Sequence, residues 1–237
     1  MRMIDIHQHL IYGIDDGANS REKMYGMLTD AKDQGIRYVF ATPHIQPGRT
    51  EFPAEYYKNT VQELNEWAAK KGLKIEVLYG AEILYTRKTL DELDTGAVPT
   101  MNGTEYVLTE FLPEVEYSEL FRALREYANG GYSPILAHME RYKCLYEHTR
   151  DRIEELRSFH VRFQMNANTA VRREGVFGKG FVNKVLKNDW VDYIASDAHG
   201  RSMRPVNLLK GYKAVESQFD SEKADRLFGG NQRRDLF

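Results

Sequence analysis

Two kinds of hydrophobic pattern alternate along the chain. Short apolar runs rich in β-branched and aromatic residues predict seven strands, at residues 3–7, 36–44, 74–82, 105–110, 133–138, 161–166 and 191–197. Between these runs, apolar residues recur at spacings of three and four, as at Met24, Met27, Leu28 and Ala31, which predicts helices. The alternation of strands and helices indicates an α/β fold with a mainly parallel sheet.

Capping and turn residues delimit several of the predicted helices. Asn19, followed three residues later by Glu22, is a candidate cap for the helix that ends near Gly35. Pro53 lies near the first turn of the next helix. Further helices are predicted at residues 53–71, 117–129, 149–159, 177–188 and 206–228, the last broken near Asp220 and Ser221.

Composition and charge narrow the class of protein. The chain has 237 residues, 42% of them hydrophobic, and no linker or change of composition, so we expect a single domain over residues 1–237. Its 33 basic and 35 acidic residues nearly balance, which does not favour nucleic acid as a partner. No apolar run is long enough for membrane insertion, and the N-terminus has no signal-type stretch. With a single cysteine and therefore no internal disulfide, the chain is expected to be cytoplasmic.

The first predicted strand ends in two histidines separated by one residue. Because side chains in a strand alternate with a period of two, His7 and His9 project to the same face while Gln8 points away. Two imidazoles on one face can bind the same cation. Taken alone, the pair is explained equally well by a chance pairing of two partly buried histidines.

Other predicted strands also end in potential metal ligands. In a parallel barrel the carboxyl ends of all strands meet on one face, which gathers residues that are distant in sequence. Five of the seven histidines lie at these ends, and only His148 and His160 lie elsewhere. A metal site is therefore predicted from the side chains that terminate six of the seven strands: His7 with His9, His44, Glu82, Glu110, His138, and Asp197 with His199.

The donor types indicate the kind of metal site. Asp197 and His199 repeat the spacing of the first pair, and one of Asp15 and Asp16 can reach the same site while the other forms a turn or caps a helix. Histidine nitrogens with carboxylate oxygens and no thiolate suit Mn, Fe or Zn in a hydrolytic cluster better than a structural zinc site.

Several segments carry a more specific resemblance. The stretches IDIHQHLIYGIDDG, GIRYVFATPHIQPG, LYGAEI, PILAHMERY and IASDAHGRSMRP resemble the polymerase and histidinol phosphatase (PHP) superfamily. Within it, they are most similar to the bacterial metal-dependent protein tyrosine phosphatases that accompany capsule and exopolysaccharide tyrosine kinases. The resemblance covers nearly the whole chain in the expected order.

This resemblance implies a distorted (β/α)7 TIM-like barrel that binds three divalent metal ions, most often Mn, with Fe or Zn as alternatives. It implies one ion at His7, His9, Glu82 and Asp197, a second at Glu82, Glu110 and His138, and a third at Asp16, His44 and His199. Arg141 and Arg204 correspond to arginines that hold the substrate phosphate. Met139 replaces a commoner proline, and Glu110 lies in an unusual TEFLP context, but neither change removes a ligand.

The implied activity is hydrolysis of protein phosphotyrosine, with a cognate bacterial tyrosine kinase as the expected substrate and partner. Closely spaced cations lower the pKa of a bridging water, so a metal-bridging hydroxide can attack phosphorus without a protein nucleophile. The planar guanidinium groups of Arg141 and Arg204 match phosphate oxygens. The sequence assigns no general acid.

Cys144 and Arg150 have the spacing of the phosphate loop in cysteine-dependent phosphatases. Glu147 would repel a phosphate there, and the loop has no glycine, so the sequence disfavours a cysteine mechanism. Two further functions stay open: a PHP-type small-molecule phosphatase acting on histidinol phosphate and a non-catalytic metal-containing kinase-binding module. An exonuclease-like PHP domain is disfavoured, because the composition is not basic and no polymerase sequence is attached. We read Gln46 to Arg49 as a turn and Arg201 as a solvated loop charge.

Overall fold

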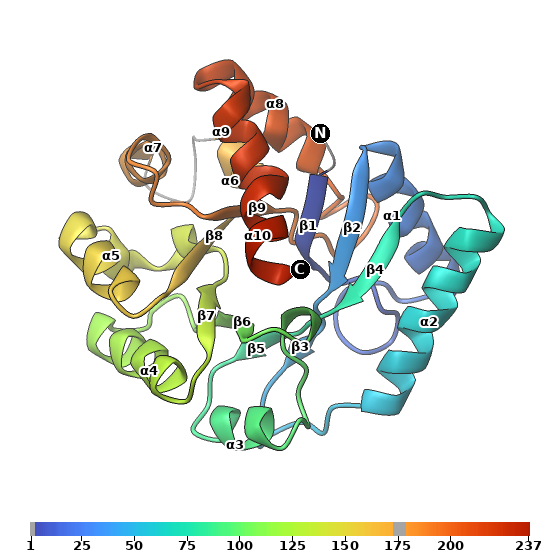
Figure 1. The fold of residues 1–237 in the computed structure, drawn as a ribbon, viewed down its shortest axis with the longest axis horizontal. Coiled ribbons are helices and arrows are strands. Elements are labelled where there is room, and N and C mark those ends of the chain that lie inside the picture. The colour runs from blue at the N-terminus through green and yellow to red at the C-terminus, as the bar shows by residue number, and fades with distance from the viewer. Residues whose placement is uncertain (1–2, 173–178) are drawn as a thin grey trace.

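The strands form a curled parallel sheet in the middle of the molecule, with helices around it (Figure 1). The computed structural model describes residues 3–172 and 179–237. One sheet has the order β1-β2-β4 and the other β3-β5-β6-β7-β8-β9. An isolated parallel bridge joins Gln8 at the end of β1 to Ala198 in the segment after β9. The strands are β1 Met3–Gln8, β2 Ile36–Ala41, β3 His44–Ile45, β4 Glu76–Tyr79, β5 Glu82–Leu84, β6 Tyr106–Glu110, β7 Ser133–Leu136, β8 Arg162–Asn166 and β9 Tyr193–Ala195.

The helices follow the predicted order, with some differences. The helix at 117–129 has the predicted bounds, and the C-terminal pattern is broken at Asp220, whose side chain caps α9. The cap of α1 is Ser20, which accepts a hydrogen bond from the Lys23 N–H, so the prediction of Asn19 is wrong. The helices are α1 Arg21–Asp33, α2 Ala54–Lys70, α3 Thr89–Asp94, α4 Tyr117–Asn129, α5 Thr149–Arg157, α6 Ala167–Arg172, α7 Lys179–Lys187, α8 Leu208–Gln218, α9 Ser221–Asp225 and α10 Asn231–Leu236.

Three short helices were not predicted, namely α3, α6 and α10, because each has too few residues to show a helical period. Residues 177–178, the start of one predicted helix, lie outside the described residues.

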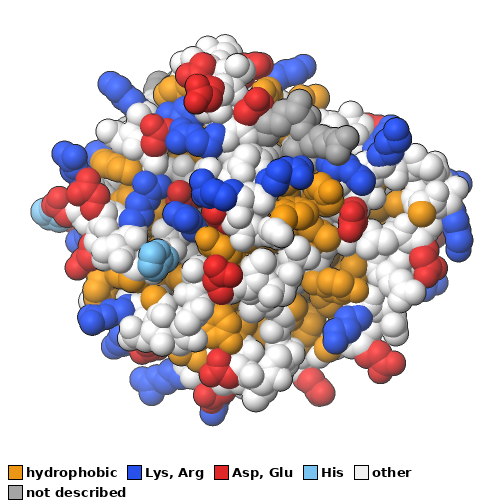
Figure 2. All heavy atoms as spheres, in the orientation of Figure 1, with side chains coloured by type: hydrophobic (Ala, Val, Ile, Leu, Met, Phe, Trp, Pro, Cys, Tyr) orange, Lys and Arg blue, Asp and Glu red, His pale blue; other side chains and the backbone are white. Residues whose placement is uncertain are grey.

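Figure 2 shows the face of the molecule seen in Figure 1, on which basic and acidic side chains are interspersed. In the part of the chain that the structure describes, no helix is both long and apolar enough to cross a membrane.

Two apolar clusters occupy opposite faces of the curled sheet. Alternate residues of five strands, among them Ile4, Leu108 and Tyr193, form one cluster with Leu236 of α10. Residues of the other parity, such as Val39 and Val107, pack with the helices in the second cluster. This division by parity indicates a sheet that is buried on both faces, as expected when helices cover a closed or nearly closed parallel sheet.

The second and third predicted strands are interrupted, so the predictions of continuous strands at 36–44 and 74–82 are wrong. The break between β2 and β3 contains Pro43, which has no N–H to donate to the ladder. The break between β4 and β5 contains Gly80, where an added Cβ would lie 2.9 Å from the sulfur of Met101. The hydroxyl of Tyr57 in α2 lies 2.8 Å from both the Ala41 and Gly80 carbonyl oxygens and accepts from the Gly80 N–H.

Strand β1 contains a register shift that directs its histidines. The pairing with β2 slips between Asp5 and Gln8. Ile4 and Ile6 belong to the apolar cluster that contains Leu108 and Tyr193, whereas the next residue, His7, and then His9 face Glu82. Such irregularities commonly re-aim side chains beside active sites.

Candidate metal centre

The predicted ligands lie together at the carboxyl ends of the strands. The side chains form three groups. Within each group, every residue offers one donor atom, and these donor atoms all lie within 4.8 Å of one another. The groups are His7, His9, Glu82 and Asp197; His9, Asp16, His44 and His199; and His44, Glu82 and Glu110. The described residues therefore offer a continuous cluster in which His9, His44 and Glu82 are each shared by two groups.

The first group is the most deeply buried. Glu82 Oε2 lies 3.1 Å from His7 Nε2 and 3.2 Å from His9 Nε2. Asp197 Oδ1 lies 3.5 Å from each of the same two nitrogens. These four residues are the set that the resemblance assigns to one ion.

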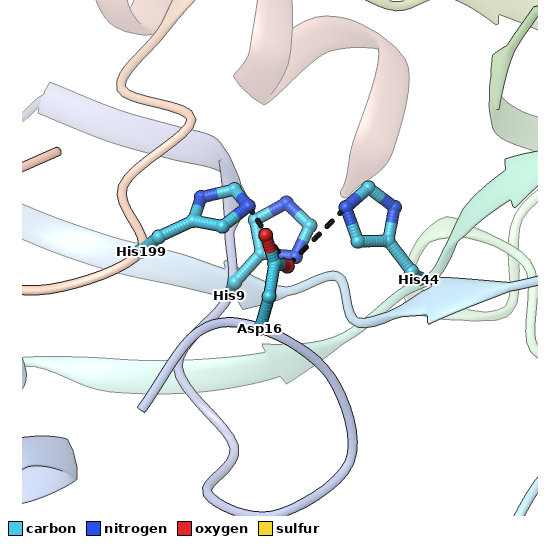
Figure 3. Close-up of side chains that lie close together, drawn as sticks. All are labelled: His9, Asp16, His44 and His199. Atoms are coloured by element: carbon cyan, nitrogen blue, oxygen red, sulfur yellow. Dashed lines mark ion pairs between the residues drawn. The ribbon is translucent and has the colours of Figure 1, made fainter. Parts of the chain in front are cut away.

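The second group, drawn in Figure 3, includes the exposed Asp16 and the partly buried His44. The carboxylate of Asp16 lies between two imidazoles, with Oδ1 3.3 Å from His199 Nε2 and 3.6 Å from His44 Nε2. The Asp16 side chain is 66% exposed. The geometry adds His9 to the three residues predicted for this ion.

The third group differs from the set implied by the resemblance. His44 Nδ1 lies 3.1 Å from both Glu82 Oε2 and Glu110 Oε1, so His44 completes the geometric group. His138 Nε2 lies 2.7 Å from Glu82 Oε1 and 3.5 Å from Glu110 Oε2. His138 is thus adjacent to the predicted carboxylates and outside the three-residue group.

The cluster shifts the pKa values of its members. Burial alone would raise the pKa of Glu82, but the adjacent His7, His138 and His9 hold it well below its usual range. Burial opposes the charged form of His138, yet its hydrogen bonds to Glu110 and Glu82 raise its pKa to about 9. Burial and the neighbouring charge of His9 lower the pKa of His199 to about 4. The carboxylate of Glu82 is therefore ionised at neutral pH.

Gln164, which was not predicted, and Asp15, which was predicted as an alternative to Asp16, orient the buried histidines. Gln164 Oε1 lies 3.2 Å from His7 Nδ1 and accepts from the His138 N–H at 2.8 Å. Asp15 Oδ2 lies 2.7 Å from His9 Nδ1 and accepts from the His44 N–H at 3.0 Å. The two Nδ1 contacts leave the Nε2 atoms of His7 and His9 directed into the cluster.

Asp15 was predicted only as an alternative to Asp16 or as a turn residue. The structure places Asp16 in the cluster and Asp15 behind His9. The following Gly17 allows this loop to approach β1, since an added Cβ would lie 2.1 Å from the His9 carbonyl oxygen. Gln164 alternates with Arg162 and Asn166 in β8, a period-two pattern that places the three polar side chains on one face but assigns a role to none of them.

The strand ends at His138 and Asp197 have an unusual backbone. Their φ angles are +34° and +53°, in the left-handed region that non-glycine residues seldom adopt. Conformations of this kind cluster at functional sites, where the surrounding structure holds them in place. Here the backbone N–H groups are held by Gln164 Oε1 and by the His7 carbonyl oxygen, respectively.

Both predicted phosphate-binding arginines converge on one carboxylate. Arg141 Nη2 lies 2.6 Å and Arg204 Nη2 2.7 Å from Asp197 Oδ2, and Asn166 donates to the same oxygen at 2.7 Å. The other oxygen of Asp197 faces His7 and His9. Two partly exposed guanidinium groups therefore lie directly beside the metal-ligand cluster, where they can bind an anion.

The rejected cysteine mechanism finds no support in the geometry. Burial raises the pKa of the Cys144 thiol to about 11, so the nucleophilic thiolate is scarce at neutral pH. Arg150 is engaged with Glu154, with 2.8 Å between Nε and Oε1. Arg201 is paired with Asp30, as a charge on the surface.

The donor set fits hard or borderline divalent cations. Glu82 Oε2 and His199 Nε2 are buried and make no hydrogen bond to the described residues, although both face oppositely charged or polar groups of the cluster. Unsatisfied buried donors and acceptors are costly in proteins. Coordination of divalent ions by imidazole nitrogen and carboxylate oxygen would satisfy them.

Comparisons with known proteins agree with this chemistry. A family model described as capsular polysaccharide synthesis, CpsB/CapC, matches residues 3–236. The chain is 32% identical to the tyrosine-protein phosphatase CpsB of Streptococcus pneumoniae, over 98% of this chain and 97% of the relative.

Solved structures extend the likeness to the fold. A structure from work on the metal-dependent tyrosine phosphatases YwqE of Bacillus subtilis and CpsB of Streptococcus pneumoniae superposes with a TM-score of 0.83 at 27% identity, covering 94% of this chain and 90% of the other. Histidinol phosphate phosphatase of Lactococcus lactis, at 18% identity, shares the fold with a TM-score of 0.58 over 97% of this chain and 98% of the other. The resemblance seen in the sequence is confirmed, and the chain belongs to the CpsB/CapC family of capsular polysaccharide synthesis.

Proposed function

We propose that this protein is a metal-dependent phosphatase that hydrolyses phosphotyrosine in proteins. The observation that carries the proposal is the convergence of Arg141 and Arg204 on Asp197, whose other oxygen faces the metal-ligand cluster. The full-length similarity to tyrosine-protein phosphatases supports the choice of substrate.

The cluster would hold three divalent ions, with manganese as the expected metal. His7, His9, Glu82 and Asp197 would hold the first and His9, Asp16, His44 and His199 the open one. Glu82 and Glu110 would hold the remaining ion with His138, which lies within 3.5 Å of both, and with His44 as a further candidate. When bound, the ions supply an activated water and neutralise charge on the phosphoryl oxygens.

The protein's own groups position the substrate. Arg141 and Arg204 would each donate to phosphoryl oxygens, exchanging part of their contact with Asp197 Oδ2 for the substrate dianion. Asn166 keeps Asp197 in place through the same oxygen. Because a phenol has a pKa of about 10, its departure needs less help from a general acid than that of an alkyl alcohol.

We also propose a fold and a partner for the protein. We propose a distorted (β/α)7 barrel in one domain, and the nine strands support this if β2 with β3 and β4 with β5 are counted as two interrupted strands. A bacterial tyrosine kinase is the proposed substrate and partner, by resemblance to the family. A cytoplasmic location and the lack of a nucleic-acid partner stay predictions.

A substrate panel tests the proposal against a small-molecule phosphatase. With Mn²⁺ present, we expect a higher kcat/KM on phosphotyrosine peptides than on histidinol phosphate. A large preference for histidinol phosphate would reverse the assignment. Bound metal without turnover of any phosphomonoester would instead indicate a binding module, and cleavage of single-stranded nucleic acid without phosphatase activity would indicate a nuclease.

A further inference from the structure

A hollow of about 440 Å³ opens directly beside the metal centre. His44 and Glu110, from the second and third ligand groups, form part of its wall. Ile45, Phe52 and Leu84 make much of the remaining wall apolar. This inner hollow therefore borders the metal-ligand cluster and offers an apolar surface to the group attached to a phosphate bound at that cluster.

A second hollow, of about 670 Å³, continues outward from the first. Gln46 and Leu84 line both, so the two form one groove that leads away from the metal centre. Its walls come from the turn after β3, the segment after β5 and the loop between β6 and α4. The groove extends well beyond the volume needed for one aromatic ring, which indicates a longer substrate.

The outer hollow carries two arginines on mutually supported loops. Arg49 and Arg87 are both exposed, and neither forms an ion pair within the described ranges 3–172 and 179–237. Lys88, by contrast, is paired with Asp91 at 2.9 Å. The Thr86 hydroxyl donates to the Pro47 carbonyl oxygen at 2.9 Å, which ties the two arginine-bearing loops together.

The turn that contains Gly48 and Arg49 is also hydrogen-bonded to α3. The Gly48 N–H donates to Glu92 Oε1 of α3 at 2.6 Å, and Gly48 has a φ of +74° that suits the predicted turn. Glu114, in the loop before α4, and Glu119, in α4, also line the outer hollow. The cationic side of the groove is thus the side of the β3 and β5 loops, continuous with the apolar wall at Leu84.

We propose that this groove binds an extended phosphotyrosine peptide whose residues beside the phosphotyrosine are acidic. The inner hollow takes the phenyl ring, and Arg49 and Arg87 in the outer hollow contact the flanking Asp or Glu side chains. This inference rests on the proposed function and adds a sequence preference to it. Charge complementarity at such sites affects specificity and association rate more than the chemical step.

The test compares free phosphotyrosine with two phosphotyrosine peptides of equal length, one with Glu and one with Lys beside the phosphotyrosine. The variant is R49E/R87E, and R125E on the exposed side of α4 is the matched control, because it changes an exposed arginine that lines neither hollow. Each protein is assayed as the Mn²⁺-loaded full chain, at low and high salt.

We expect the wild type to favour the Glu peptide at least fivefold in kcat/KM, with the preference shrinking at high salt. In R49E/R87E the preference should disappear or invert while the rate on free phosphotyrosine stays within twofold of wild type, and R125E should resemble the wild type. If the wild type hydrolyses both peptides equally well, or if R49E/R87E keeps the wild-type preference, the proposed binding of acidic residues in the groove is wrong. The proposed phosphatase function would then still stand. Failure of the wild type to hydrolyse any phosphotyrosine substrate would overturn the proposed function and this inference with it.

Discussion

Asp197 connects the two halves of the candidate site through its two carboxylate oxygens. Oδ1 faces His7 and His9, while Oδ2 receives Arg141, Arg204 and the Asn166 amide. Although burial would raise the pKa of Asp197, the charges of His7 and His9 hold it well below its usual range. One ionised side chain can therefore hold a metal and at the same time orient the groups that bind phosphate.

Asp15 makes a pH-dependent contribution to stability. Burial would raise its pKa, but the hydrogen bond and charge of His9 and the N–H groups of Gly17 and His44 lower it to about 2. A carboxyl group whose pKa is lower in the folded than in the unfolded state stabilises the protein above the unfolded pKa, and the effect is lost as the pH falls through the folded pKa.

For chelator-treated protein, we expect D15N to reduce the free energy of unfolding by about 2 kcal/mol at pH 6, with the deficit shrinking as the pH falls toward 2. Denaturant titrations at several pH values measure this. D33N, which removes an exposed carboxylate from α1, controls for the change in net charge. A deficit that is constant across this pH range would contradict the role assigned to Asp15.

Cys144 is predicted to be unreactive and dispensable. Because its pKa is about 11, its thiolate fraction at pH 7.5 should be about 100-fold below that of a thiol with a pKa of 9, and its alkylation correspondingly slow. The alkylation rate should rise about tenfold per pH unit until the pH approaches 11. C144S should keep its metal content and its phosphatase activity, and loss of turnover in metal-loaded C144S would revive the cysteine mechanism.

At the scale of elements, the interrupted strands place ligands that continuous strands would not. β3 starts at His44 and β5 at Glu82, each just after the break in its strand, and these two residues pair in register. The Tyr57 hydroxyl of α2 provides hydrogen bonds for backbone groups at both breaks. A helix on the outer face thus supports two residues of the metal centre.

Removing the Tyr57 hydroxyl tests whether it stabilises the backbone at the two breaks. Y57F should lower the free energy of unfolding of metal-loaded protein by about 1–3 kcal/mol, because it leaves buried backbone groups without a partner. Y79F, which removes a hydroxyl from an exposed tyrosine on β4, should have little effect in the same denaturant titration. Equal stability of Y57F and wild type would show that other groups satisfy the backbone at the breaks.

At the scale of the whole molecule, the order of elements and the positions of the ligands followed from sequence patterns. The period-two pairs and the polar residues at the ends of apolar runs identified His7, His9, Glu82 and Asp197, which the fold brings together. These signals are local, and a parallel topology brings the strand ends that carry them to one edge of the sheet.

What the sequence did not predict depends on contacts between distant elements. The break at Gly80, the register shift in β1 and the left-handed backbone at His138 and Asp197 are set by tertiary contacts, whereas the break at Pro43 follows from the missing N–H of proline. The orienting role of Gln164 follows from its placement between His7 and His138, which no periodicity encodes.

The central claim is that phosphotyrosine hydrolysis depends on metal held by this cluster. The most direct test measures metal content per chain together with phosphotyrosine hydrolysis for the wild type, H138A and R141A. We predict that H138A loses bound metal and turnover, whereas R141A keeps its metal and loses at least tenfold in kcat/KM through weaker phosphate binding. Turnover by metal-free wild type, or full activity in H138A without its metal, would contradict the account.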